Sequence, residues 1–362
     1  MIKDSIQKQK AVRYCVAHGY VPFMECLIRY SADTSDKAAD ITDVDVLGVR
    51  PAAEMNARRL VFDCKTLAKT SAVGRALWAA GLLQLLKADE AFVILLKPAP
   101  EGHRLAARQI NVHLFAEKLF DEHGRASSAD YLDGITYLDN LEAWDALWAL
   151  RLKYPRMSPL IEYLSSDAAF ERDPAVGFRM LLARLKLAEG EFDVSKPEHR
   201  LLYGVVVSQA MVFLSSLVHE FNAVFDAGMK LEVFQASLRN YVWGGREGVE
   251  LRKRLQVALQ AGRKEEIHEF QLPGWDMFVE VTRSLLDAPL LSGAAALPVK
   301  DLAFKEVALP SALADKRIKF ELTGNARARQ YALLVNRYVG SLSRLLKDCS
   351  DHLAGALAKA TI

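Results

Sequence analysis

Apolar residues along the first third of the chain switch between a helical and a strand spacing. Residues 4–18 place Ile6 and Val12 on one helical stripe and are followed by Gly19, a residue type that commonly ends a helix. Runs of strand-forming residues come next, interrupted by a long helical segment at residues 71–88 and a shorter one before the last strand. The predicted strands lie at residues 19–31, 41–50, 60–67, 91–98 and 110–115. This order predicts an α/β domain, with a mixed sheet flanked by helices.

Beyond residue 122 the helical spacing predominates. Trp144 and Trp148 lie four residues apart on one predicted helix. Residues 203–218 form the most apolar stretch, but they are too few to span a membrane, so we expect a buried helix. The chain thus divides into an α/β domain at residues 1–122 and a mostly helical domain at residues 123–362. We expect the helical domain to recognise the substrate or to dock a partner.

Two segments near the C-terminus have a different pattern. Residues 301–309 and 316–322 alternate between apolar and polar side chains, which predicts a pair of strands. Residues 325–359 predict a single long amphipathic helix, with Thr323 or Asn325 as its N-cap.

Composition and charge exclude few functions. The 362 residues carry a formal net charge of +2, so no overall attraction to nucleic acid or to a membrane follows. The four cysteines are scattered, which argues against a disulfide framework and against a zinc site. The polar N-terminus lacks the apolar core of a signal peptide. We therefore expect a cytoplasmic protein that does not enter a membrane.

The candidate chemistry lies in residues 41–67. The first strand of this stretch carries Asp43 and Asp45, and the second carries Asp63 and Lys65. Side chains two positions apart on a strand point to the same face, so each pair lies together. Charge is costly to bury on a strand unless it is paired or holds a metal ion. The acid-x-Lys spacing occurs once in the chain, and an ordinary exposed ion pair is the alternative interpretation.

Together with the order of elements, these residues resemble the PD-(D/E)xK, or restriction-endonuclease-like, nuclease superfamily. The resemblance covers the first third of the chain and implies an endonuclease that uses Mg²⁺ or Mn²⁺, with DNA as the expected substrate. It implies that Asp45 and Asp63 are catalytic metal ligands and that Lys65 is the catalytic lysine. Defence against foreign DNA or DNA repair would follow that superfamily's common uses. A ribonuclease and a catalytically weak scaffold or regulatory subunit are the alternatives.

These residue types suit phosphodiester hydrolysis. Mg²⁺ prefers hard oxygen ligands and retains waters, so two or three carboxylates leave room for a phosphate oxygen and a nucleophilic water. A lysine beside them can orient that water or stabilise the phosphate as it is attacked. If burial lowers its pKa, the lysine can instead act as a base.

Further residues are expected around this core. The superfamily often supplies a glutamate from its first helix, where this chain offers only Gln7 and Gln9, so Glu25 on the next strand is the candidate third metal ligand. Asp43 is an alternative ligand on the same strand face. Arg75 on the following helix and Lys69 in the loop before it are candidates to line the site. A solvated surface position is the alternative for both.

A basic cluster in the helical half is a weaker candidate for nucleic-acid binding. Its members are Lys316, Arg317, Lys319, Arg327 and Arg329. They lie across a predicted strand-to-helix junction, and the N-terminus of a helix favours phosphate. A solvated helix face is the alternative. The same half is also the candidate surface for self-association or for a protein partner.

Overall fold

The computed structural model describes residues 2–30, 39–51, 57–66, 71–226, 228–259 and 271–361. The first part consists of α1 (Ser5–Ala17), β1 (Val21–Tyr30), β2 (Ala39–Arg50), β3 (Arg58–Lys65), α2 (Ala72–Leu86), β4 (Glu90–Leu95), α3 (Glu101–Arg108), β5 (Val112–Ala116) and α4 (Glu117–Ser127). This order, as far as β5, is the one that the sequence predicts, and the mixed α/β class is confirmed.

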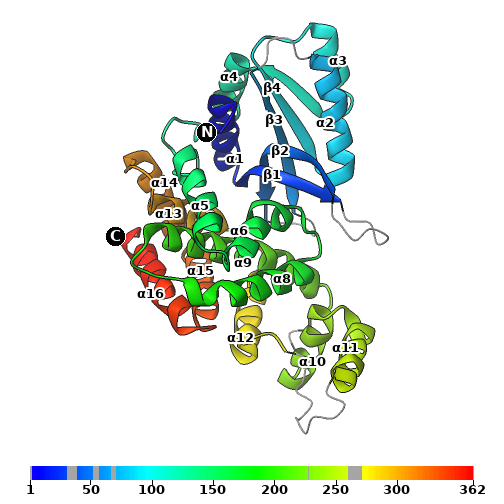
Figure 1. The fold of residues 1–362 in the computed structure, drawn as a ribbon, viewed down its shortest axis with the longest axis vertical. Helices are drawn as coiled ribbons and strands as arrows, with labels where there is room; N and C mark the ends of the chain where they lie inside the picture. The colour runs from blue at the N-terminus through cyan, green and yellow to red at the C-terminus, as the bar shows by residue number, and fades with distance from the viewer. Residues whose placement is uncertain are drawn as a thin grey trace.

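The five strands form one sheet in the order β1-β2-β3-β4-β5. β1, β2 and β3 are antiparallel neighbours, whereas β3, β4 and β5 run parallel and are connected through α2 and α3. α1 and α4 pack on the sheet together, and α2 and α3 lie on its other side (Figure 1). The central strand β3 is buried along most of its length, as expected for a strand covered on both faces.

α1 packs against β2 at a glycine. A Cβ atom on Gly48 would lie 2.8 Å from Sγ of Cys15, so glycine is what lets the helix approach the strand this closely. The buried face of α1 includes Gln7 and Lys8. Ile6, which the sequence pattern placed on the apolar stripe, is exposed.

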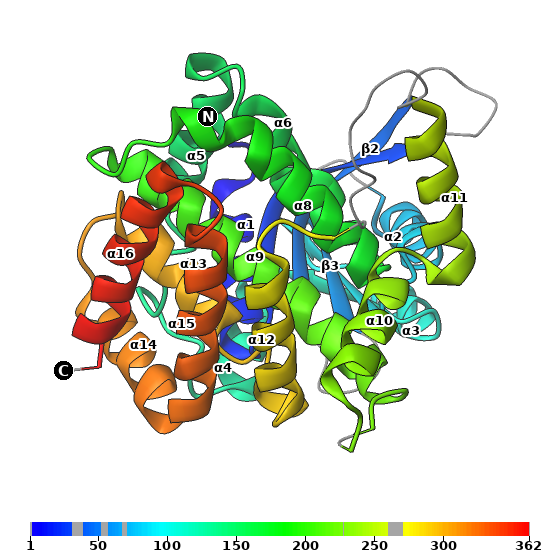
Figure 2. The same ribbon diagram turned by 90° about the horizontal axis from the view of Figure 1, so that it is seen from below.

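The rest of the described chain is helical. Its elements are α5 (Leu141–Lys153), α6 (Ser158–Glu162), the π-helix η1 (Tyr163–Asp167), α7 (Ala168–Phe170), α8 (Pro174–Ala188), η2 (Glu189–Glu191), α9 (Pro197–Asn222), α10 (Leu231–Val242), α11 (Gly245–Leu259), α12 (Trp275–Leu286), η3 (Pro289–Leu291), α13 (Ala296–Lys305), α14 (Ala312–Gly324), α15 (Ala326–Gly340) and α16 (Arg344–Lys359). α8, α12, α13, α15 and α16 surround α9 (Figure 2). α9 is long and apolar enough to cross a membrane, but 94% of its most apolar window is buried inside the protein, as expected for a core helix.

The strand pair predicted at residues 301–309 and 316–322 is wrong. These residues belong mainly to α13 and α14. In α14 the buried residues Ala314, Ile318 and Leu322 recur at the helical interval of four. These segments are short, and some of their polar residues are buried. Their pattern of apolar and polar residues therefore fits both the strand period of two and the helical period of 3.6.

The long helix predicted at residues 325–359 is broken into α15 and α16. Ser343 begins the second helix, because its side chain accepts a hydrogen bond from the Leu346 N–H at 3.3 Å. The predicted cap at Asn325 is confirmed, since its side chain accepts from the Ala328 N–H at 2.9 Å.

β1 joins the α/β part to the helical part. Lys300 of α13 is buried and donates from Nζ to the carbonyl of Pro22 at 2.7 Å, beside the ring of Phe23. On the same strand, the N–H of Leu27 donates to Oγ of Ser166 in η1 at 3.2 Å. The two parts therefore contribute to one continuous hydrophobic core.

Candidate active site

Asp45 and Asp63 lie where β2 and β3 separate. The last backbone pair at this end of the two strands is Val46 with Phe62, and each aspartate is the neighbour of one member of that pair. Both carboxylates are buried beside Nζ of Lys65, with Asp45 Oδ2 at 2.9 Å and Asp63 Oδ1 at 3.1 Å. The three residues predicted to carry the chemistry therefore meet at one ammonium group.

The Asp45 side chain bridges the two separating strands. Its Oδ2 accepts a hydrogen bond from the backbone N–H of Cys64 at 2.7 Å, and its Oδ1 lies 3.0 Å from Nζ of Lys8. Burial opposes the charge, but Lys65, Lys8 and the Cys64 N–H together hold the pKa of Asp45 below its usual value. Asp45 is therefore ionised at neutral pH.

Arg75 holds Asp63 from α2. The helix begins after Ser71, whose side chain caps it by accepting from the Gly74 N–H at 3.2 Å, so Arg75 lies in the first turn. Its Nε donates to Asp63 Oδ2 at 2.7 Å, and a terminal nitrogen pairs with Oδ1. The guanidinium also lies over the ring of Trp78, 3.9 Å from its centroid. Arg75 thus lies in the site, and its two bonds orient the Asp63 carboxylate.

Lys65 keeps its proton in this arrangement. Burial alone would lower its pKa, but the carboxylates of Asp45 and Asp63 outweigh burial and raise the pKa of Lys65 above that of a free lysine. The side chain can therefore donate hydrogen bonds and stabilise negative charge. Burial therefore does not lower the pKa of Lys65 in this network, as a role as general base would need.

Two more charged side chains complete the network. Glu25 on β1 pairs with Lys8 of α1, which is 2% exposed and also contacts Asp45. Glu25 has a left-handed backbone (φ 55°), which is uncommon for a residue other than glycine. The sequence interpretation missed Lys8. Lys8 lies four residues before Val12, so the helical period places both on the buried face of α1, and this spacing could have indicated its burial.

The oxygen donors at this site are of the kind that a divalent cation prefers. Asp45 and Asp63 meet at Lys65, and Gln7 adds an amide group whose Nε2 donates to the Lys65 carbonyl at 3.3 Å. The Oε1 of Gln7 is buried and has no hydrogen-bond partner among the described residues. Carboxylate and amide oxygens suit Mg²⁺ or Mn²⁺. In the described ranges no three Asp, Glu, His or Cys side chains form a metal-ligand group, so Glu25 does not complete one with the two aspartates.

The network opens into a cleft of about 820 Å³. Its lining includes Lys8, Glu25, Asp43, Asp45 and Lys65 from the α/β part and Asp145, Trp148, Arg151, Glu162 and Ser166 from the helical part. Asp43, the alternative metal ligand, is exposed here and lies outside the buried network. The cleft therefore gives solvent and ligands access to Asp45 and Lys65 between the two parts of the chain.

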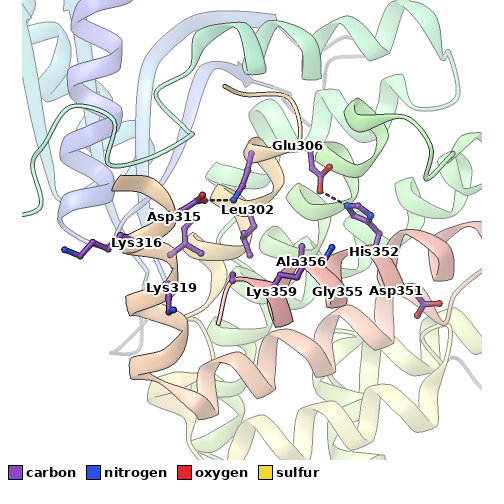
Figure 3. Close-up of a pocket in the computed structure, with 13 residues that line it drawn as sticks. Leu302, Glu306, Asp315, Lys316, Lys319, Asp351, His352, Gly355, Ala356 and Lys359 are labelled. Carbon is purple, nitrogen blue, oxygen red and sulfur yellow. Dashed lines mark hydrogen bonds and ion pairs between the residues drawn. The ribbon is translucent and has the colours of Figure 1, made fainter. Parts of the chain in front are cut away.

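The predicted basic cluster does not form one surface. Arg317 is buried and pairs with Asp301 and Glu321, so it is not available to nucleic acid. Lys316 and Lys319 line a separate groove of about 780 Å³ between α14 and α16 (Figure 3). The expected strand-to-helix junction is a junction between two helices, because α14 replaces the predicted strand.

The remaining predicted residues are also dispersed. Arg327 lies 3.9 Å from Asp287, and Arg329 is half-buried on α15. Lys69 lies outside the described residues.

No family model, curated protein or solved structure matches the chain. The geometry of the site is therefore the basis for a functional assignment.

Proposed function

We propose that the protein is a metal-dependent phosphodiesterase of the PD-(D/E)xK type, acting as an endonuclease with DNA as its substrate. The observation that carries the proposal is that Asp45 and Asp63 both contact the ammonium of Lys65, beside a cleft that Asp45 and Lys65 line. The mixed sheet and its order of elements support the same superfamily. The contacts of these side chains suggest a role for each of them in the proposed reaction.

Asp45 and Asp63 would hold the divalent cation, which supplies Lewis-acid stabilisation of the phosphoryl group and an activated water. Arg75 orients Asp63 through both carboxylate oxygens, and the Cys64 N–H orients Asp45. Lys65, whose pKa the two carboxylates raise, would donate hydrogen bonds to the phosphate oxygens as their charge develops. Each carboxylate is thus positioned by a group other than the catalytic lysine.

The charges around the cleft support a requirement for divalent cations. The acidic lining residues are Asp4, Glu25, Asp40, Asp43, Asp45, Asp145 and Glu162, and the basic ones are Lys3, Lys8, Arg29, Lys65 and Arg151. Acids outnumber bases, so a phosphate backbone would be repelled unless a cation is also present. We expect nucleic-acid binding in this cleft to depend on Mg²⁺, Mn²⁺ or Ca²⁺.

Cleavage assays on single- and double-stranded DNA and RNA with Mg²⁺ or Mn²⁺ test the proposal. We expect Asp63→Asn and Lys65→Met to lose cleavage by about 10²-fold or more while the circular dichroism spectrum is unchanged. Asp43→Asn decides between the two neighbouring acids, because we expect it to retain activity that Asp45→Asn loses. Failure to cleave any substrate with either ion, or full activity in Asp63→Asn, would reject the proposal.

A second candidate is a nuclease-like module without catalysis that serves a larger complex. It is supported by the charge balance of the network, in which Lys8, Lys65 and Arg75 face Glu25, Asp45 and Asp63. A balanced network does not need a metal ion for its stability. Calorimetry separates the candidates, because this one predicts that neither Mg²⁺ nor Mn²⁺ binds to the purified protein.

A further inference from the structure

Lys8 lies between two carboxylates that come from neighbouring strands. Its Nζ is 3.0 Å from Asp45 Oδ1 and is hydrogen-bonded to Glu25 Oε1. The backbone pairs Met24 with Val46 and Cys26 with Val44 place Glu25 across from Asp45. The lysine reaches them from α1, a separate element, and its side chain is 2% exposed.

The two acidic partners explain why the ammonium group of Lys8 can be buried. Removing a lysine from water is costly, and the cost is offset only when opposite charges and hydrogen bonds replace the water. A divalent ion that bridged Glu25 and Asp45 would also have to lie between their facing oxygens. The ammonium and such an ion therefore compete for the same space and the same lone pairs.

We propose that Lys8 is a built-in cation that takes the place of a divalent ion between Glu25 and Asp45. While Lys8 is in place, Glu25 is not a metal ligand. A divalent ion can bind only on the Asp63 side of Asp45, where Lys65 would have to move aside. The side chain of Lys65 is 26% exposed and can move into the cleft, whereas that of Lys8 is 2% exposed. The part that concerns the Asp63 side rests on the proposed function. The exclusion of an ion from the Glu25 side depends on the position of Lys8 alone.

The test counts Mn²⁺ ions bound per chain, by calorimetry and by electron paramagnetic resonance of free Mn²⁺. Lys8→Met removes the charge and keeps much of the side-chain volume, and we expect it to bind one ion more than the wild type. Lys10→Met is the matched control, because Lys10 lies on the same helix and pairs with Glu117 at 3.1 Å. We expect this control to bind the same number of ions as the wild type.

The double variant Lys8→Met/Glu25→Gln identifies the location of the added ion. We expect it to lose that ion, because Glu25 no longer offers a charged oxygen. Lys8→Met leaves Glu25 and Asp45 without their positive partner, which should destabilise the fold. The added ion should offset this loss, since it replaces the missing positive charge. We therefore expect Mn²⁺ to raise the melting temperature of Lys8→Met more than that of the wild type.

The outcomes separate this proposal from the proposed function. One ion in the wild type and two in Lys8→Met support both. No ion in the wild type and one in Lys8→Met support the role of Lys8 and reject the metal-dependent activity. Equal numbers in the two proteins overturn the role of Lys8. A Lys8→Met chain that stays unfolded at millimolar Mn²⁺ overturns it as well.

Discussion

Lys300 lies at the contact between α13 and β1, where an apolar environment surrounds its amine. Burial lowers the pKa of Lys300 to about 7, whereas an unfolded chain would protonate it up to about 10.5. The nearby thiol of Cys26 stays neutral in this range, because burial raises its pKa to about 12. Between pH 7 and 10.5 the unfolded state thus binds more protons at Lys300 than the folded state, and the contribution of Lys300 to stability rises with pH.

Lys300→Met should remove this pH dependence. We expect the free energy of unfolding of the wild type, measured relative to Lys300→Met, to rise by up to about 1.4 kcal/mol per pH unit from pH 7 to 9.5, because the other titrating groups are common to both proteins. Lys300→Met should be more stable than the wild type at pH 7, and this difference in the free energy of unfolding should shrink as the pH rises to 9.5. Urea denaturation at several pH values measures both. Lys305→Met, on the more exposed side of the same helix, should keep the wild-type slope.

At the residue scale, the sequence predicted the centre of the site and missed one of its supports. Asp63 and Lys65 were predictable because strand periodicity places them on one face, whereas Asp45 was preferred over Asp43 only by its position in the motif that the chain resembles. Arg75 was predictable from its place on the helix that follows. The position of Lys8 four residues before Val12 was a weak signal, because a lysine in a helical stripe is usually solvated, and the contacts with Glu25 and Asp45 explain its burial.

At the scale of elements, the predictions were accurate where each element has one clear period. The strands of the sheet and α9 have long apolar runs, whereas α13 and α14 bury polar groups. Asp301 of α13 is fully buried because Arg317 of α14 pairs with it and Thr136 donates to it at 2.9 Å. A buried ion pair between two helices places charged residues on the buried face of each helix. The local sequence of one helix does not show that its buried charge is paired with a charge on another helix.

The contact between α15 and α16 provides a test at the element scale. A Cβ atom on Gly340 would lie 2.4 Å from Cβ of Ser350, so the two helices meet where there is no space for a side chain. We expect Gly340→Ala to lower the free energy of unfolding by about 1–3 kcal/mol, because the helices must move apart. Thermal and urea denaturation measure the loss.

Gly355→Ala is the matched control for this test. Gly355 is an exposed residue within α16, and a Cβ atom there would meet nothing within 4 Å. Alanine favours the helix over glycine, so we expect a gain of up to about 1 kcal/mol. Equal effects of the two substitutions would contradict the close contact at Gly340.

At the scale of the whole molecule, the helical part forms one wall of the cleft and covers β1. Trp148 and Arg151 of α5 line the same cleft as Asp45 and Lys65. The sequence predicted the α/β class and the helical remainder, but it did not predict how the two parts pack together. Contacts such as that of Lys300 with Pro22 join residues far apart in the chain, and no local pattern encodes them.

Trp148 tests whether this wall contributes to substrate binding. Its half-buried ring packs beside Trp144 and reaches the cleft, where it can stack on an unpaired base. We expect Trp148→Ala to weaken binding of a single-stranded oligonucleotide by about tenfold, measured by fluorescence anisotropy with Ca²⁺. Trp148→Phe keeps an aromatic face and should retain most of the affinity. Equal weakening in both variants would indicate a packing defect and contradict stacking.

The close approach of α1 to β2 has a consequence for how this site can diversify. The position of Lys8 depends on how deeply α1 rests on the sheet, and Gly48 and Cys15 set that depth. A larger side chain at either position would lift the helix and draw the ammonium away from Glu25 and Asp45. The electrostatics of the cleft can thus be adjusted through two uncharged residues. A substitution that alters no charged residue can therefore change the charge balance of the cleft.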